Sequence, residues 1–211
     1  MRNNLLPIAK EGLPYIFCSI GFFILFGFLD FDFLQFFVFL AIIFFIFTFR
    51  NPERELPNFQ EASVVTPSDG IISNIEELKD DKYAYKVEIN SNYFNVSLLR
   101  VPLTSTVKEV KILHGARVSK FNPLHVEINE NATIIFQDTN DNTLKITHQL
   151  KQSFKTLNIE LINLQHLNQG TRYGVMLNGI TTIYLPKNFR LNVSVGSEVH
   201  ASQSLLGYFT S

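Results

Sequence analysis

The sequence predicts a soluble all-β domain, sandwich-like or barrel-like, that follows an N-terminal two-helix transmembrane hairpin. Two observations support this prediction. Between Leu13 and Phe49 the only formally charged residues are Asp30 and Asp32, in a run rich in phenylalanine and isoleucine. From residue 55 onward, apolar and polar residues alternate in short runs separated by turn-forming residues, which is the pattern of β-strands.

The composition excludes several classes of protein. The 211 residues are enough for one globular domain and a small extra element. A net charge of -1 argues against a nucleic-acid partner, because nucleic-acid binders usually carry a basic face. The single cysteine, Cys18, provides no disulfide framework, and the five histidines lack the spacing of metal ligands. We therefore expect no metal site.

The apolar run is too long for one membrane-spanning helix. A continuous helix over it would measure about 55 Å, whereas the hydrocarbon core of a bilayer is roughly 30 Å thick. The acidic break at Asp30-Phe31-Asp32 divides the run into helices at about 13–29 and 33–49, each near the lower length limit for a span. A buried hairpin of a soluble protein would show a polar face, which neither segment has. No small-residue cleavage site follows the first segment, so a cleaved signal peptide is disfavoured.

The charged flanks predict the orientation of the hairpin. Arg2 and Lys10 precede the first helix, Arg50 and Arg54 follow the second, and the turn between the helices carries only acids. Cytoplasmic flanks of membrane helices are enriched in lysine and arginine. We therefore expect a multi-pass protein of the inner membrane with both flanks, and the β domain, on the cytoplasmic side.

The remaining sequence defines the second unit. We expect residues 1–54 to form the flank and hairpin and residues 55–211 to form the β domain, although a modest helix within 151–170 stays open. Turn-forming groups of Asn, Asp, Gly and Pro separate the strands. The clearest alternating runs are Tyr83 to Ile89, Ala132 to Phe136, Leu144 to Ile146 with its neighbours, and Arg190 to Val195.

Several short blocks of this sequence resemble those of the phosphatidylserine decarboxylases of the short, membrane-anchored bacterial type. Their order, spacing and preceding hairpin carry the resemblance together. The blocks are Phe49 to Arg54 (similar to F-R-D-P-x-R), Thr66 to Gly70 (S-P-x-D-G), Phe94 to Pro102 (F-D-V-H-x-x-R-x-P), Asn129 to Asn131 (N-E-R-N), Arg172 to Pro186 (R-x-G-x-x-x-x-G-S, then Leu-Pro) and Val195 to Val199 (V-G-x-x-V).

The resemblance implies an enzyme of phospholipid biosynthesis that cleaves itself. In that family a serine hydroxyl attacks the preceding glycine carbonyl, and the serine becomes a pyruvoyl group. A histidine acts as base and an aspartate orients it, as for other activated nucleophiles. The pyruvoyl group then serves as the electron sink that converts phosphatidylserine to phosphatidylethanolamine.

Two of these three groups are replaced here. Asp69 stands at the aspartate position, but Ser97 stands at the histidine position and has no useful basicity near neutral pH. Gly179 and Ile180 occupy the cleavage site, and the hydrocarbon side chain of Ile180 stands where the serine is needed. The substitution predicts that no pyruvoyl cofactor forms. Without its histidine, Asp69 is better explained as a turn residue before Gly70.

Neighbouring hydroxyls offer a possible rescue. Thr181 and Thr182 follow the lost serine, and cleavage before Thr181 would leave a 2-oxobutanoyl cap. This cleavage would shift the scissile bond by one residue, and successive residues of a strand face opposite sides. His114 or His148 are candidate substitute bases, and the sequence does not place them. We consider this rescue the weaker alternative.

Three functions follow from these residues. The favoured one is a non-catalytic, decarboxylase-like membrane protein whose β domain still binds the phospholipid bilayer, a phosphatidylserine headgroup or a partner. The second is an active decarboxylase that uses Thr181 or Thr182. The third is a structural subunit of a homo-oligomer, or of a hetero-oligomer with an active homologue.

Overall fold

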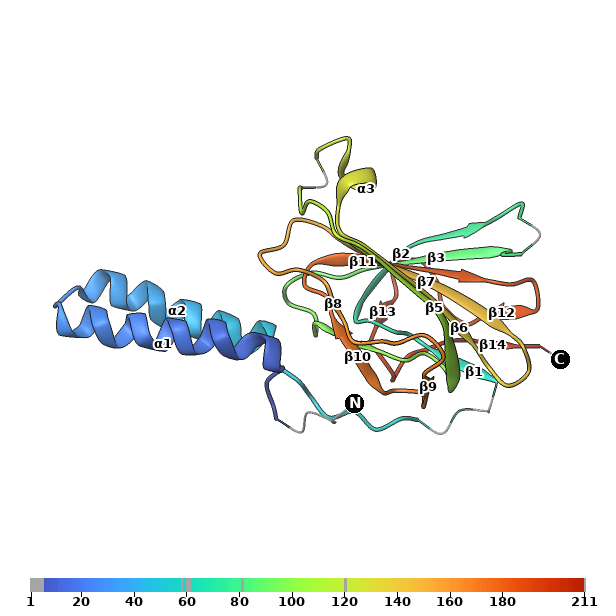
Figure 1. Ribbon diagram of the computed structural model, residues 1–211, viewed down its shortest axis with the longest axis horizontal. Helices are drawn as coiled ribbons and strands as arrows, with labels where there is room; N and C mark the ends of the chain where they lie inside the picture. Colours follow the sequence, from blue (N-terminus) through green and yellow to red (C-terminus); the bar gives the residue numbers. More distant parts are fainter. Residues whose placement is uncertain (1–5, 58, 60–61, 81, 120, 211) are drawn as a thin grey trace. The chain divides into compact units, whose positions relative to one another are not determined.

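The computed structural model describes residues 6–57, 59, 62–80, 82–119 and 121–210 (Figure 1). The chain divides into two compact units, Met1–Glu53 and Arg54–Ser211. The first is helical and the second is mostly β-sheet, as the sequence predicts.

The N-terminal unit contains two long helices, α1 (Leu13–Phe28) and α2 (Asp32–Thr48), which pack against each other. A short 3-10 helix, η1 (Lys10–Gly12), precedes α1. Asp30, with a φ of 56°, lies in the left-handed region that asparagine and aspartate tolerate, so the chain can reverse between the helices. Most large apolar side chains of both helices are exposed on this unit.

One described helix is long and apolar enough to cross a membrane. It comprises the 19 residues Lys10–Phe28, with a mean hydropathy of 1.6. The second, Asp32–Thr48, is a shorter apolar helix. Length and composition therefore indicate membrane association through an N-terminal apolar helix.

The second unit is built from antiparallel strands that form three sheets in the described ranges. The large sheet has the order β13-β2-β3-β11-β7-β6-β5-β9, and the smaller sheets have the orders β1-β14-β12 and β4-β10-β8. The strands are β1 (Ser63–Val65), β2 (Gly70–Glu77), β3 (Tyr85–Asn90), β4 (Leu98–Arg100), β5 (Ser105–Leu113), β6 (Asn131–Gln137), β7 (Thr143–Leu150), β8 (Asn158–Ile159), β9 (His166–Leu167), β10 (Arg172–Val175), β11 (Gly179–Leu185), β12 (Phe189–Leu191), β13 (Glu198–Val199) and β14 (Leu205–Phe209). A single helical turn, α3 (His125–Ile128), lies between β5 and β6.

The strand β11 lies near the middle of the large sheet, between β3 and β7. Its side chains alternate between a buried and an outer face, as do those of β6 and β7. The buried face contributes Ile183 and Leu185 to the hydrophobic core, together with Ile89 of β3 and Ile146 of β7. The outer face carries Ile180, Thr182 and Tyr184, which are only partly buried.

Most predicted strands are confirmed, one is shorter than predicted, and the alternative left open for residues 151–170 is resolved. The alternating runs at Tyr83 to Ile89, Ala132 to Phe136 and around Ile146 form β3, β6 and β7. The strand predicted at Arg190 to Val195 is shorter, because β12 ends at Leu191 and a turn closed by a bond from Ser197 N to Ser194 O follows. Residues 151–170, all of them described, contain β8 and β9 and no helix.

Candidate functional site

Gly179 and Ile180 lie at the start of β11. Asn178, with a φ of 53°, is in the left-handed region, and its side-chain amide donates to Gln152 O at 2.6 Å. The carbonyl of Gly179 accepts a hydrogen bond from Ser91 N at 2.9 Å. A Cβ atom on Gly179 would lie 2.5 Å from Met176 Sδ and 2.7 Å from Gln149 O, so only glycine fits. The peptide that corresponds to the family's cleavage site is therefore held in one geometry.

The side chain of Ile180 borders an open hollow of about 450 Å³ on the outer face of the sheet. Phe121, Lys151 and Asn178 also line this hollow, and none of the described residues that line it is acidic. The Lys151 ammonium donates to Asn90 Oδ1 at 2.6 Å and to Ser91 O at 2.9 Å. The hydrocarbon side chain at the cleavage-site position and the Lys151 side chain thus line the same hollow.

Ser97 is buried beside the loop that leads to this site. Its carbonyl accepts a hydrogen bond from Met176 N at 2.8 Å. Its Oγ atom is buried, and no described residue lies within hydrogen-bonding range of it. Such orphaned hydroxyls are uncommon in protein interiors. The serine at the position of the family histidine therefore contacts neither Ile180 nor Asp69 through a hydrogen bond among the described residues.

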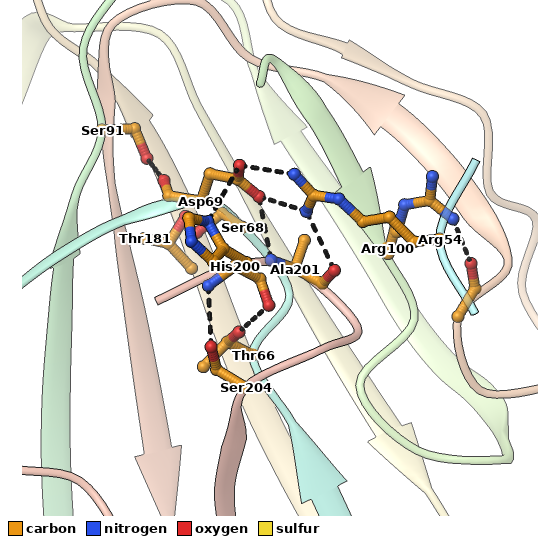
Figure 2. A network of polar contacts seen from close by, with 11 residues as sticks. Arg54, Thr66, Ser68, Asp69, Ser91, Arg100, Thr181, His200, Ala201 and Ser204 are labelled. Carbon is orange, nitrogen blue, oxygen red and sulfur yellow. Dashed lines mark hydrogen bonds and ion pairs between the residues drawn. The ribbon is translucent and has the colours of Figure 1, made fainter. Parts of the chain in front are cut away.

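The carboxylate of Asp69 is fully engaged by structural partners (Figure 2). Arg54 binds both oxygens, with Nη1–Oδ1 at 2.5 Å and Nη2–Oδ2 at 2.7 Å, and both side chains are buried. The backbone N–H of Ala201 donates to Oδ1 at 2.8 Å, and His200 Nδ1 lies 3.7 Å from Oδ2. This bidentate pair orders the residues around the carboxylate. The sequence identified neither Arg54 nor His200 as a partner of Asp69.

A single serine joins Asp69 to the cleavage-site peptide. Ser91 Oγ donates to Asp69 O at 2.5 Å, and Ser91 N donates to Gly179 O. Figure 2 shows this bond on the side of Asp69 opposite the guanidinium group of Arg54. The fold therefore brings the backbone of Asp69 close to Gly179 while its carboxylate points toward Arg54.

Thr181 lies on the buried face of β11, inside a chain of polar side chains. Its Oγ1 atom accepts a hydrogen bond from Ser68 Oγ at 3.0 Å and lies 2.9 Å from His148 Nδ1. His148 Nε2 lies 2.6 Å from the hydroxyl of Tyr173. Because His148 is the neighbour of Thr181 in the ladder between β7 and β11, the register of the sheet creates this contact. Apart from the alternation within each strand, no sequence pattern predicts the contact between Thr181 and His148.

Burial sets the protonation of this chain of side chains. It lowers the pKa of His148 to about 3, so the imidazole is neutral near pH 7. It also raises the pKa of Tyr173 above its usual range, so the phenol stays protonated. Thr181 and His148 thus have the geometry of a nucleophile and a base, but a base with so low a pKa accepts a proton poorly.

The other candidate residues lie elsewhere. Thr182 is on the outer face of β11, and His114 Nδ1 lies 3.2 Å from Glu130 Oε1, with most of its ring in solvent. Among the described residues, no group of three or more His, Cys, Asp or Glu side chains is arranged to hold a metal ion.

Comparison with known proteins identifies the class to which this fold and site belong. Residues 41–207 match the family model described as phosphatidylserine decarboxylase. The chain is 28% identical over 211 residues to a phosphatidylserine decarboxylase proenzyme of Geotalea uraniireducens, covering 98% of this chain and 99% of the relative. It is 28% identical over 212 residues to a proenzyme of the same name from Desulfotalea psychrophila, with 98% and 99% covered. A Burkholderia pseudomallei proenzyme is 29% identical over 203 residues, with 94% of each chain covered.

The family assignment rests on the whole domain and not on one motif. The matched residues run from α2 to β14 and include all the strands of the large sheet. This chain belongs to the phosphatidylserine decarboxylase family.

Proposed function

We propose that this chain is a membrane-anchored member of the family that neither cleaves itself nor decarboxylates phosphatidylserine. One observation carries the proposal: at the start of β11, the position after Gly179 holds Ile180. A pyruvoyl group forms from a residue with a β-hydroxyl or β-thiol, and the side chain of isoleucine has neither. The residues present therefore do not fit the family's prosthetic group.

The two other positions of the family triad support the same conclusion. Ser97 offers a buried hydroxyl in place of an imidazole, and a hydroxyl is not a base near neutral pH. The Asp69 carboxylate is held by Arg54 and Ala201, which supports a structural role for this residue. Family membership alone does not establish activity, because activity depends on the site.

A second candidate function is an active decarboxylase that cleaves before Thr181. The 2.9 Å separation between Thr181 Oγ1 and His148 Nδ1 favours it. Three features weigh against it. His148 is a weak base, Thr181 is completely buried, and Thr181 is paired on both sides within the sheet. A keto group formed at this position would face the core, where the amine of a phospholipid has no access.

The apolar helices carry the proposed membrane anchor. We infer that α1 and α2 both cross the inner membrane as a hairpin, with basic flanks and β domain on the cytoplasmic side. The 17 residues of α2 span about 26 Å at 1.5 Å per residue, close to a hydrocarbon thickness of roughly 30 Å. Protease accessibility of the β domain in sealed inverted vesicles tests this topology: we expect cleavage without detergent.

For a chain without catalytic activity, the outer face of the large sheet favours a role in binding an anionic phospholipid headgroup. The hollow beside Ile180 carries the Lys151 ammonium and, among its described lining residues, no acid. An oligomer, with a second copy or with an active homologue, is the remaining prediction on partners. Co-purification from the expressing membrane tests it.

The decisive assay is decarboxylation of phosphatidylserine by the full chain in vesicles, expressed in cells without another family member. We expect no release of carbon dioxide above the background of empty vesicles, and sustained turnover would contradict the proposal. The Ser97→His/Ile180→Ser double variant restores both lost groups and should recover cleavage after Gly179. The matched Ser97→His/Ile180→Val variant lacks the hydroxyl and should stay intact.

A further inference from the structure

A segment between β5 and β6 projects from the β domain with its apolar side chains outward. We define the projecting segment as the described residues 114–119 and 121–128, which include α3 (Figure 1). Phe121 is 87% exposed, Leu124 is 52% exposed and Val126 is 59% exposed. Single exposed apolar residues are ordinary, but a group of them on one short projection marks an interaction site.

Polar groups hold the base of the projecting segment to the domain. Ala116 N donates to Ile128 O at 2.7 Å, which closes the two ends of the segment on each other. The buried side chain of Asn129 accepts from Val118 N at 2.9 Å and donates to Leu150 O at 2.9 Å. Buried polar contacts therefore anchor the base of the segment, while the side chains of Phe121, Leu124 and Val126 are exposed.

The tip of the projecting segment also has a defined backbone. Leu124 N donates to Asn122 Oδ1 at 3.0 Å, and His125 Nδ1 lies 2.8 Å from Asn122 O. Gln149 of β7 donates to Val126 O at 2.7 Å. These bonds fix the segment while leaving the apolar side chains outside, so their exposure is a property of the folded domain.

The residues around the projecting segment favour a lipid bilayer as the surface that it contacts. Phe121 lines the same hollow as Lys151, so an apolar tip adjoins a cationic recess. Arg117 lies within the segment, whose one acidic residue is Glu127. Apolar side chains beside basic ones suit the interface of a membrane that contains anionic lipids. The same chain carries a helix that is apolar enough to cross a membrane, and five residues separate α2 from Arg54, so the proposed anchor would tether the β domain to a bilayer.

We propose that the projecting segment inserts Phe121, Leu124 and Val126 into the bilayer interface and so presents the hollow to phospholipid headgroups. This inference rests on the membrane anchoring in the proposed function, and it does not depend on the absence of catalysis. It assigns the three residues an attachment role that is separate from the position of Ile180.

The chain has no tryptophan, so one introduced indole reports a single position. In the test, the full-length Phe121→Trp variant is reconstituted into phosphatidylcholine–phosphatidylserine vesicles with ordinary or brominated acyl chains. We expect bromination to reduce its emission about twofold or more, because interfacial insertion of about 5–10 Å brings the indole to the acyl boundary. Adding Leu124→Asp to this variant should restore most of the emission.

Two matched variants calibrate the measurement. Ile162 is 74% exposed and lies outside the projecting segment, between β8 and β9, where its neighbour Asn163 accepts a hydrogen bond from Val110 N of β5. The Ile162→Trp variant should therefore keep its emission. The Phe22→Trp variant, on α1, should be quenched strongly and so verifies reconstitution.

The outcomes separate this inference from the proposed function. Unquenched emission from Phe121→Trp, with strong quenching from Phe22→Trp, would overturn insertion and leave the anchor intact. Unquenched emission that shifts with the protein-to-lipid ratio would mean that the segment contacts a second copy of the chain, and it would also overturn insertion into the bilayer. Absence of quenching from Phe22→Trp as well would refute the membrane anchor itself. The intact mass of each preparation reports self-cleavage independently.

Discussion

On the outer face of β11, Ile180 borders an open hollow but carries no reactive atom. On the buried face, Thr181 carries a hydroxyl beside His148 but is enclosed in the core. Self-cleavage followed by decarboxylation needs a nucleophile, a base and access to substrate at one position. Because neighbouring residues of a strand face opposite sides, this chain divides these requirements between two positions. A hydroxyl one residue from the family position is therefore not equivalent to one at that position.

The largest expected effect comes from removing the partner of Asp69, since this tests whether that residue is structural. Arg54→Met leaves a buried carboxylate without its cation and should destabilise the β domain by about 3–5 kcal/mol. Urea unfolding of the detergent-solubilised chain, followed by circular dichroism, measures the loss. Lys86→Met, which removes partly exposed ion pairs with Glu88 and Glu76, is the control and should cost less than about 1 kcal/mol. Equal, small effects would mean that the Arg54 pair does not organise this region.

The next effect is the pH dependence of folding stability that the buried His148 causes. Its imidazole titrates near 6.5 when unfolded and at about 3 when folded, so the unfolded state binds more protons between these values. The contribution of His148 to the free energy of unfolding is fully present above about pH 6.5. It decreases as the pH falls toward 3, at up to about 1.4 kcal/mol per pH unit. His148→Gln should remove this part of the slope. A slope in His148→Gln identical to that of the unaltered chain would contradict the assignment.

The smallest effect compares the two threonines directly. Thr181→Val removes the hydrogen-bond partner of Ser68 Oγ and of His148 Nδ1 in the core and should cost about 1–3 kcal/mol. Thr182→Val changes the outer face, where substitutions usually stay within about 0.5 kcal/mol. Chemical unfolding of both variants measures the difference. Similar losses in the free energy of unfolding would contradict the assignment of Thr181 to the buried face and Thr182 to the outer face of β11.

The sequence predicted the architecture better than the contacts between distant residues. Strict alternation predicted β6 and β7, and the apolar run divided at Asp30 predicted the helices. The bond between Thr181 and His148 depends on the register of β7 against β11, which alternation within each strand does not specify. The Arg54–Asp69 pair depends similarly on the folded path of the chain.

The projecting segment was missed for a different physical reason. Phe121 and Leu124 are residue types typical of a core, and only the tertiary structure shows that their side chains are exposed. At the cleavage position the opposite holds. The identity of Ile180 is itself the informative feature, because its lack of a hydroxyl does not depend on how the chain folds.

The intact mass of the protein purified from its membrane tests the central claim most directly. A single chain near 24.2 kDa, the mass of the whole sequence, is the expected result, because no hydroxyl stands after Gly179 at the exposed position. Two fragments divided between residues 178 and 182, the C-terminal one blocked by a keto-acyl group, would contradict the account. Their exact masses would show whether cleavage occurred before Thr181 or before Thr182.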